Sequence, residues 1–99
     1  MLKHTMTQDN KFFHFIVEGH AGHSDGKEFD AVCGMVSVLA QAALYGCAKY
    51  CKKVKVTKKE SGHLDFYFPK ENEICKAICE AAHAGIMQVA EQFPQCFER

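Results

Sequence analysis

A long stretch without a charged side chain is the feature that most limits how this chain can fold. Residues 31–48 contain no Asp, Glu, Lys or Arg and consist mainly of Ala, Val, Leu, Met, Cys and Gly. Asp30, directly before the stretch, is a candidate N-cap, so the pattern predicts a helix. A helix of this composition is expected to be buried on nearly all sides, partly by a second copy of the chain. We therefore expect a homodimer.

The same stretch is about as long as the shortest membrane-spanning helices, so that alternative has to be weighed. Its Ala and Gly content, with Ser37 and Gln41 inside, makes insertion into a bilayer unfavourable, and flanking anchors are not evident. The first residues, Met1 to His4, also lack the apolar core of a secretory signal. We expect a cytoplasmic protein with no membrane partner.

Length limits the number of domains, and net charge limits the kind of partner. The chain has 99 residues, which is the size of one domain, so residues 1–99 are expected to form a single domain. Its formal net charge is zero. Proteins that bind the phosphate backbone are normally clearly basic, so direct nucleic-acid binding is not expected.

The rest of the chain predicts two β-hairpins and a second helix. The expected strands are residues 2–7, 11–18, 52–57 and 64–68, and the expected second helix is amphipathic and covers residues 71–93. Asp9-Asn10 predicts a turn between the first two strands, and Pro94 is expected to stop the second helix. Apolar residues on both faces of 11–18 predict a central strand covered on two sides. The fold class is therefore α+β, in the order ββαββα, with one four-stranded, mostly antiparallel sheet and two packed helices.

A glycine-rich polar segment joins the first hairpin to the first helix. It includes Gly19, Gly22, His23 and Gly26 and shows neither helical nor strand periodicity. Loops of this length inside a small domain are usually functional or disordered. We interpret the segment as a mobile loop that contributes to a functional site.

Cys33 is the residue in this chain best placed for nucleophilic chemistry. If Asp30 caps the helix, Cys33 lies in the first turn, where backbone N–H groups have no helical partner. The partial positive charge there stabilises a thiolate, and the same N–H groups could bind an oxyanion. His20 lies at the end of a strand, just before the loop that leads back to Cys33, and His23 offers a second base.

Two short motifs then carry a resemblance that spans most of the chain. They are Gly19-His20-Ala21 and Asp30-Ala31-Val32-Cys33, the second running into Val36-Ser37-Val38-Leu39. Together they resemble the ribosomal-processing cysteine protease family (Prp), in which a Gly-His-Ala motif ends the second strand and an Asp-x-Val-Cys motif opens the first helix. The ββαββα order is that of the same family. Gly34 and Met35 depart from it, because small Ala-type residues are more typical after the cysteine.

The resemblance implies an endopeptidase. Family members remove a short N-terminal extension from a large-subunit ribosomal protein and cut after an aromatic residue, so the N-terminal segment of such a protein is the implied partner. By matching position, Cys33 would be the nucleophile and His20 its base. Asp30 and Ser37 would be supporting residues, Asp30 as the helix cap and Ser37 one turn beyond the thiol on the same face. No cofactor and no metal are required.

A second hypothesis is a non-catalytic, ribosome-associated binding module. Residues 49–59 hold six lysines and no acidic residue. Such a segment is usually a solvated edge strand that is protected from aggregation. It could also steer the chain toward ribosomal RNA or an acidic partner.

A third hypothesis is a metal-binding module. Cys33, His20 and His23 could supply three zinc ligands with an open fourth position. Two C-x3-C pairs, Cys47/Cys51 and Cys75/Cys79, could bring four thiolates together. Their spacing differs from the usual C-x2-C knuckle, so we interpret them as buried apolar thiols.

Overall fold

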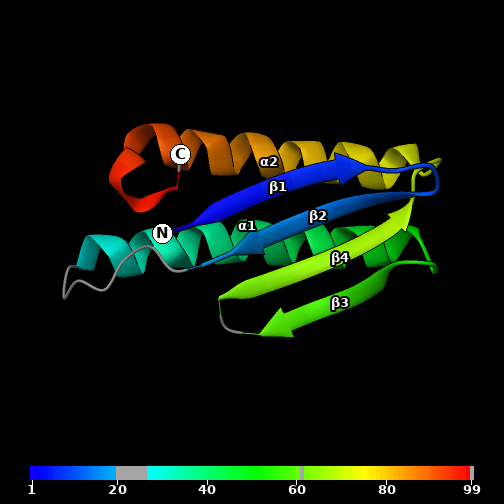
Figure 1. Ribbon diagram of the computed structural model, residues 1–99, viewed down its shortest axis with the longest axis horizontal. Helices are drawn as coiled ribbons and strands as arrows, with labels where there is room; N and C mark the ends of the chain where they lie inside the picture. The colour runs from blue at the N-terminus through cyan, green and yellow to red at the C-terminus, as the bar shows by residue number, and fades with distance from the viewer. Residues whose placement is uncertain (20–26, 61, 99) are drawn as a thin grey trace.

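A computed structural model of the chain describes residues 1–19, 27–60 and 62–98, with the backbone alone at residues 27–30. The elements follow the predicted ββαββα order (Figure 1). They are β1 (Lys3–Gln8), β2 (Phe12–Glu18), α1 (Lys27–Tyr50), β3 (Lys55–Glu60), β4 (His63–Pro69), α2 (Glu73–Gln92) and the short 3₁₀ helix η1 (Pro94–Cys96). The fold class expected from the sequence is confirmed.

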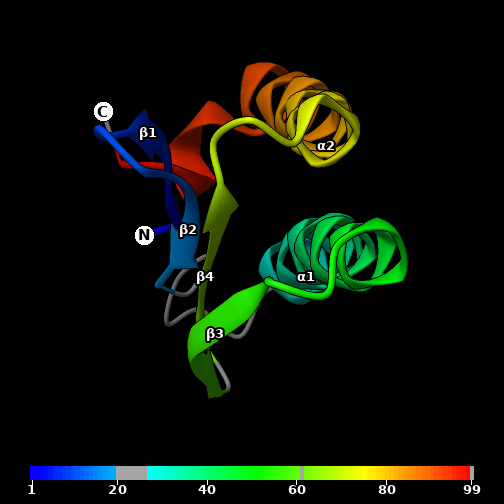
Figure 2. The same ribbon diagram turned by 90° about the vertical axis from the view of Figure 1, so that its right-hand side faces the viewer.

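The four strands form one antiparallel sheet in the order β1-β2-β4-β3. Both helices lie against the same face, with α2 nearer β1 and α1 nearer β3 (Figure 2). The prediction that β2 is covered on two sides is therefore wrong for the described residues. Apolar side chains occur on its other face because they pack across strands. The ring of Phe12, for example, meets the ring of Tyr67 edge-on, with centroids 5.0 Å apart.

The helix-facing side of β2 and β4 forms the centre of the core. Phe15 lies opposite Phe66, Val17 lies opposite Leu64, and all four side chains are buried. On α1, a stripe of buried residues faces them at helical spacing. Its members are Val32, Val36, Ala40, Ala43, Leu44 and Cys47. Burial of this stripe fixes which side of α1 faces the sheet.

Residues 31–50 of α1 are long and apolar enough, by length and composition alone, to cross a membrane, and 33% of this stretch is buried inside the fold. The buried part packs on the sheet and on α2, as in the core helix of a globular domain. Met35 and Val38, on the side turned away from the sheet, are exposed in a single copy of the chain. The predicted burial on nearly all sides is therefore not achieved by one copy.

Cysteine thiols fill the contact between α1 and α2. Cys47, Cys75 and Cys79 are fully buried, and Cys47 Sγ lies 3.8 Å from Cys79 Sγ. Burial raises the pKa of the Cys75 thiol to about 12, and a hydrogen bond with Cys79 raises the pKa of the Cys47 thiol still further. The Cys47 and Cys75 thiols therefore stay protonated, and all three thiols pack as small apolar residues, as predicted.

All six cysteines lie within the described residues, and no two of them form a disulfide. Across residues 1–19, 27–60 and 62–98, no group of three or more His, Cys, Asp or Glu side chains is arranged to hold a metal ion. Three of the four thiols in the C-x3-C pairs are buried in the core, and Cys51 is half-buried.

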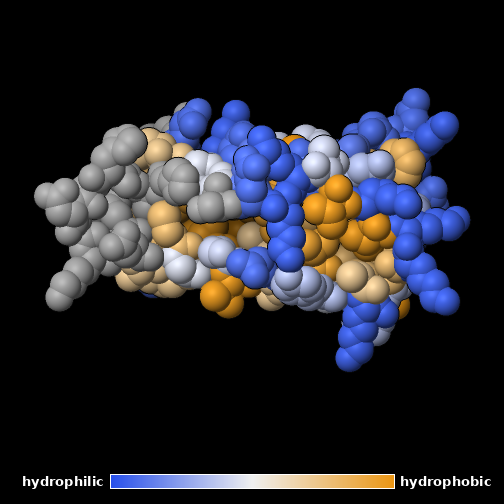
Figure 3. Space-filling view, turned by 90° about the horizontal axis from the view of Figure 1, so that it is seen from below, coloured by the Kyte–Doolittle hydropathy of each residue, from blue (hydrophilic) through white to orange (hydrophobic). Residues whose placement is uncertain are grey.

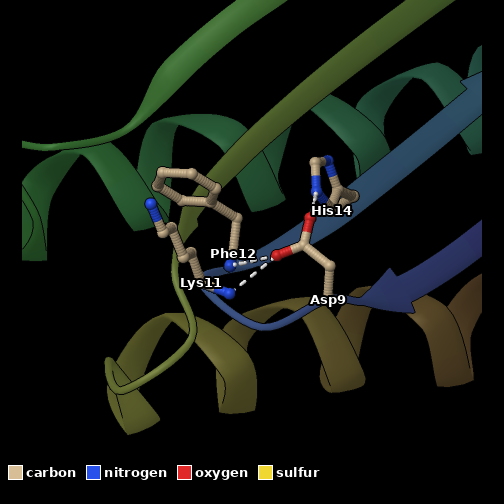
Figure 4. A network of polar contacts seen from close by, with 4 residues as sticks. All are labelled: Asp9, Lys11, Phe12 and His14. Carbon is tan, nitrogen blue, oxygen red and sulfur yellow. Dashed lines mark hydrogen bonds and ion pairs between the residues drawn. The ribbon is translucent and has the colours of Figure 1, made fainter.

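Asp9 organises the turn of the first hairpin (Figure 4). Its Oδ1 accepts hydrogen bonds from the backbone N–H groups of Lys11 and Phe12, at 2.8 and 2.7 Å, and its Oδ2 lies 3.0 Å from His14 Nε2. The two backbone bonds, with a smaller contribution from His14, hold the pKa of Asp9 at about 2. The Asp-Asn turn predicted between the first two strands is confirmed, with the mechanism expected for an Asx turn.

The two chain ends lie side by side, which the sequence did not indicate. Leu2 pairs with Phe97 in a parallel bridge. Its N–H donates to the Cys96 carbonyl at 2.9 Å, and its carbonyl accepts from the Glu98 N–H at 2.7 Å. The helix-stopping effect of Pro94 is confirmed, and the residues after it return to the start of β1. Leu2 is buried as a result.

His4 and His83 form a histidine pair between β1 and α2. Their Nδ1 atoms lie 2.9 Å apart, and His4 Nε2 is buried with no hydrogen-bond partner among the described residues. The ring of Phe15 packs against His4 from β2. Burial, and then the charge of His83, lower the pKa of His4 to about 4. His4 therefore stays neutral in the folded chain at pH values where a free histidine takes up a proton.

This difference predicts acid sensitivity. As the pH falls from about 6.5 to about 4, the unfolded chain binds a proton at residue 4 that the folded chain does not. The stability is therefore complete above about pH 6.5 and decreases as the pH falls through this window. We expect His4→Phe to reduce the loss in Tm between pH 7 and pH 5, measured by circular dichroism. His14→Phe, on the open face of the sheet, is the control and should keep most of the wild-type loss. An unchanged slope in His4→Phe would contradict the assignment.

Candidate active site

Cys33 lies on α1 at the edge of a pocket of about 490 Å³. The pocket is enclosed by α1 on one side and by the ends of β2, β3 and β4 on the other. The buried residues Leu2, Val17 and Leu64 form part of its apolar lining. Cys33 itself is half-buried, so its sulfur belongs to a site that is partly shielded from water and still open to a substrate. We refer to this site as the Cys33 pocket.

The start of α1 differs from the sequence prediction. The helix begins at Lys27, three residues before Asp30, so Asp30 is not the N-cap. Residues 27–29 contain neither Gly nor Pro, and nothing in them stops the helix from extending toward the N-terminus. Cys33 therefore lies in the second turn, where its N–H group is used within the helix. The prediction of unpaired N–H groups at Cys33 is wrong, and the helix dipole acts mainly on the first turn.

Helical spacing predicts that Ser37, Gln41 and Tyr45 form one stripe of α1 that continues from Cys33. The first two reach the pocket, whereas Tyr45 lies farther along the helix. Cys33, Ser37 and Gln41 all line the Cys33 pocket. The side-chain amide of Gln41 donates to Ser37 Oγ at 2.9 Å. Because the Ser37 oxygen accepts this bond, its own O–H is directed elsewhere. Ser37 thus places a hydroxyl group one turn beyond the thiol, in the lining of the same pocket.

Gly19 ends β2 in a conformation that requires glycine. Its φ is +99°, and a Cβ at this position would collide with the main-chain carbonyl of Met1. Its N–H donates to the carbonyl of Gly62 at 2.8 Å. Gly19 also lines the Cys33 pocket. The predicted mobile loop therefore starts from a residue that is fixed by its neighbours.

The other residues predicted for this loop cannot be placed. Outside the described residues lie His20, Gly22, His23 and Gly26. The geometry between Cys33 and His20 is therefore not described. The three-ligand zinc hypothesis depends on His20 and His23 and falls outside the described residues for the same reason. What the structure does place is the residue before His20, on the wall of the pocket that Cys33 lines.

The structure adds polar residues that sequence reasoning did not connect with Cys33. Lys59, Glu60 and His63, from the second hairpin, line the same pocket. His63 Nδ1 lies 3.7 Å from Glu18 Oε2, across the pairing of β2 with β4. The antiparallel register of β2 with β4 puts His63 opposite Glu18, at the end of β2. The sequence alone does not show that these two strands pair, so it could not connect His63 with Cys33.

Comparison with known proteins gives a consistent picture. The sequence matches the family described as cysteine protease Prp over residues 1–98. An essential ribosomal processing protease Prp from S. aureus, solved with a covalently linked product peptide, has a TM-score of 0.82 at 16% identity, over 99% of this chain and 96% of that chain. SMU.848 from Streptococcus mutans has a TM-score of 0.71 at 22% identity, over 96% and 88%. At these identities the structural likeness shows the fold. No curated protein matches the sequence.

Gly19 offers a direct test of how the pocket is built. Gly19→Ala forces a side chain into a positive φ, at a cost of roughly 1–2 kcal/mol, and adds the collision with Met1. We expect a Tm lower by roughly 5–15 °C in a thermal melt. Gly34→Ala is the matched control, because a Cβ at Gly34 meets nothing within 4 Å and alanine favours the helix. The account of Gly19 fails if both variants melt at the wild-type temperature.

Proposed function

This chain belongs to the cysteine protease Prp family, and we propose from that premise that it removes the N-terminal extension of a large-subunit ribosomal protein by cutting after an aromatic residue. As a member of this family the chain is a peptidase. The S. aureus relative is a ribosomal processing protease whose structure holds a covalently linked product peptide. This relative supports the extension of the same substrate class to the present chain.

One observation carries the proposed catalytic pair. Cys33 and Gly19 line the same pocket, although they come from different elements. Gly19 directly precedes His20 in the sequence, so the residue bonded to the proposed base lines the Cys33 pocket. The apolar lining beside Cys33 also suits an aromatic side chain next to the scissile bond. This arrangement supports Cys33 as the nucleophile and His20 as the base.

The proposed reaction is acyl transfer in two steps. His20 takes the proton of the Cys33 thiol, and Sγ attacks the carbonyl carbon of the scissile bond. His20 then gives the proton to the leaving amine, so the N-terminal extension remains as a thioester on Cys33. A water molecule loses a proton to His20 and attacks the thioester. This attack releases the extension as a carboxylic acid and returns the proton to the thiol.

Ser37 has a defined part in this scheme. Because Cys33 lies in the second turn of α1, the N–H groups of the helix start are not next to it. The Ser37 hydroxyl is one turn away, lines the pocket and is oriented by Gln41. We assign Ser37 as a donor to the oxyanion that forms during the attack. Asp30 has no capping role in this scheme.

The cysteines support a reducing compartment. None of the six forms a disulfide, and Cys47, Cys75 and Cys79 are buried between α1 and α2. A peptidase with a thiol nucleophile also requires that this thiol stays reduced. We propose a cytoplasmic location on these grounds.

The dyad is tested with a peptide that carries the extension, ending in an aromatic residue, followed by the start of the mature protein. We expect Cys33→Ala and His20→Ala to lower kcat/KM by at least about 10³-fold. Ser37→Ala should lower kcat by about 10²-fold with little change in KM, because it removes one oxyanion donor. Product masses and initial rates are measured by liquid chromatography with mass spectrometry.

A matched control shows whether a loss of cleavage is specific to Cys33 and His20. His23→Ala removes the other histidine of the same segment and should stay within about threefold of wild type. Cleavage that survives Cys33→Ala would overturn the proposal. If wild type binds ribosomes in sedimentation and leaves the peptide intact, the lysine-rich edge and a non-catalytic role are favoured instead.

We also propose that the chain forms a homodimer through the helix layer. On α1, Val38 is 68% exposed and no charged residue follows Asp30 before Lys49. On α2, Ile74 and Met87 are 56% and 51% exposed. Large apolar residues exposed on two neighbouring helices are unusual in a monomer and typical of an interface.

A charge placed in this layer should separate the copies. Val38→Glu adds a carboxylate at an exposed site, so a single copy tolerates it, whereas an apolar interface does not. We expect wild type to have the mass of a dimer in light scattering after gel filtration, and Val38→Glu that of a monomer. Thr7→Glu, on the exposed far edge of β1, should remain dimeric. A monomeric wild type would contradict the proposal.

A further inference from the structure

A second apolar pocket continues from the Cys33 pocket along α1. It has a volume of about 330 Å³ and lies between the C-terminal half of α1 and the start of β3. Leu44, Ala48, Val54 and Val56 supply most of its apolar lining. We call it the distal pocket. Figure 3 views this side of the molecule, where apolar surface lies in two areas separated by hydrophilic side chains.

Lys59 connects the two pockets. It lines both of them, and its ammonium group donates to the hydroxyl of Tyr45 on α1 while lying 4.7 Å from the centre of that ring. The side chain therefore crosses the groove from β3 to α1. Exposed contacts of a cation with an aromatic ring contribute only about 0.5–1 kcal/mol, so a bound chain can displace this one at modest cost.

The position of Lys59 results from an irregularity in β3. The register of β3 against β4 shifts between Val56 and Lys58, which leaves an extra residue in β3. Without this bulge the alternation of the strand would turn Lys58, not Lys59, toward α1. With it, Lys59 stands opposite Leu64, on the helix-facing side.

β3 is also the free edge of the sheet on this side. It is the last strand in the order β1-β2-β4-β3, and every one of its residues is exposed. The outward N–H and C=O groups of an edge strand can pair with an added extended peptide. Every second side chain of such a peptide would point toward the groove between β3 and α1.

We propose that the distal pocket is a substrate subsite. It takes an apolar side chain of the peptide substrate about five to seven residues from the scissile bond. The proposal rests on the function proposed above and adds a specificity determinant to it. The occupant is the substrate itself, because the distal pocket shares Lys59 with the Cys33 pocket and continues along the same groove.

The spacing follows from the dimensions of α1. Leu44 and Ala48 lie 11 and 15 residues beyond Cys33, which corresponds to about 16 and 22 Å along a helix. An extended peptide advances about 3.3 Å per residue, so it covers these distances in about five to seven residues. The second hairpin gives a similar length, because the chain from Lys59 back along β3 to Val54, just before the strand, reaches from one pocket to the other.

The test is a position-by-position comparison on a parent peptide that wild type cleaves. Each residue within about eight positions on either side of the scissile bond is replaced in turn by leucine and by serine, and kcat/KM is measured for each pair. We expect a ratio near one at most remote positions. Five to seven residues from the bond, on one side, leucine should be favoured about tenfold, mainly through a lower KM.

A matched pair of enzyme variants ties this preference to the pocket. Val56 is 48% exposed, and Thr7 is exposed on the far edge of β1, so truncation of either should leave the fold intact; Tm and oligomeric state are measured for both variants. Val56→Ala should reduce the tenfold preference to about threefold or less, and Val56→Asp should abolish it. Thr7→Ala, on the edge of β1 and outside both pockets, should retain it.

The outcomes separate this proposal from the function on which it rests. If wild type cleaves no parent peptide, the proposed function fails. If wild type cleaves the parent with Cys33-dependent kinetics and no remote position shows a leucine preference above twofold, the distal subsite is wrong. A remote preference that Val56→Asp leaves unchanged also overturns it.

Discussion

The burial of one side of α1 against the sheet is the interaction on which the rest of this structure depends. The stripe of Val32, Val36, Ala40 and Cys47 faces the core formed by Phe15 and Phe66. Successive helical residues are rotated by about 100° around the helix axis. Once the direction of this stripe is fixed, the direction of the stripe beside it is fixed as well. The neighbouring stripe carries Cys33, Ser37 and Gln41 and has to face the groove beside β3. One apolar contact thus holds the fold together and directs the Cys33 thiol toward its pocket.

The ends of the chain complete the pocket that this helix opens. Leu2 is held by backbone hydrogen bonds to Cys96 and Glu98, and its side chain forms part of the lining beside Cys33. Gly19 is then held between Met1 and Gly62. A small domain has little interior to spare. Here the site lies where the N-terminus, the end of β2 and the second hairpin meet, and each of these segments also contributes to stability.

Much of the fold could be predicted because it follows from local patterns. Alternation of apolar residues, the Asp9 turn and the amphipathic second helix led to the right order of elements, and the stripe from Cys33 to Gln41 followed from helical spacing alone. Two predictions were wrong for identifiable reasons. Asp30 is a good capping residue but does not stop a helix from starting earlier, at Lys27. The apolar residues on the far face of β2 pack on β4 across the sheet rather than under a third layer.

The amino-acid sequence by itself determined the class of fold, the face of α1 that carries the thiol, and the motifs that link the chain to its family. These properties depend on residues that are neighbours along the chain or one helical turn apart. Only the tertiary structure decided which strands pair, that Lys59 rather than Lys58 faces α1, and that Gly19, Leu2 and Cys33 share one pocket. Each of these depends on contacts between residues far apart in sequence. Their geometry is set by how well the core packs, and no local pattern records it.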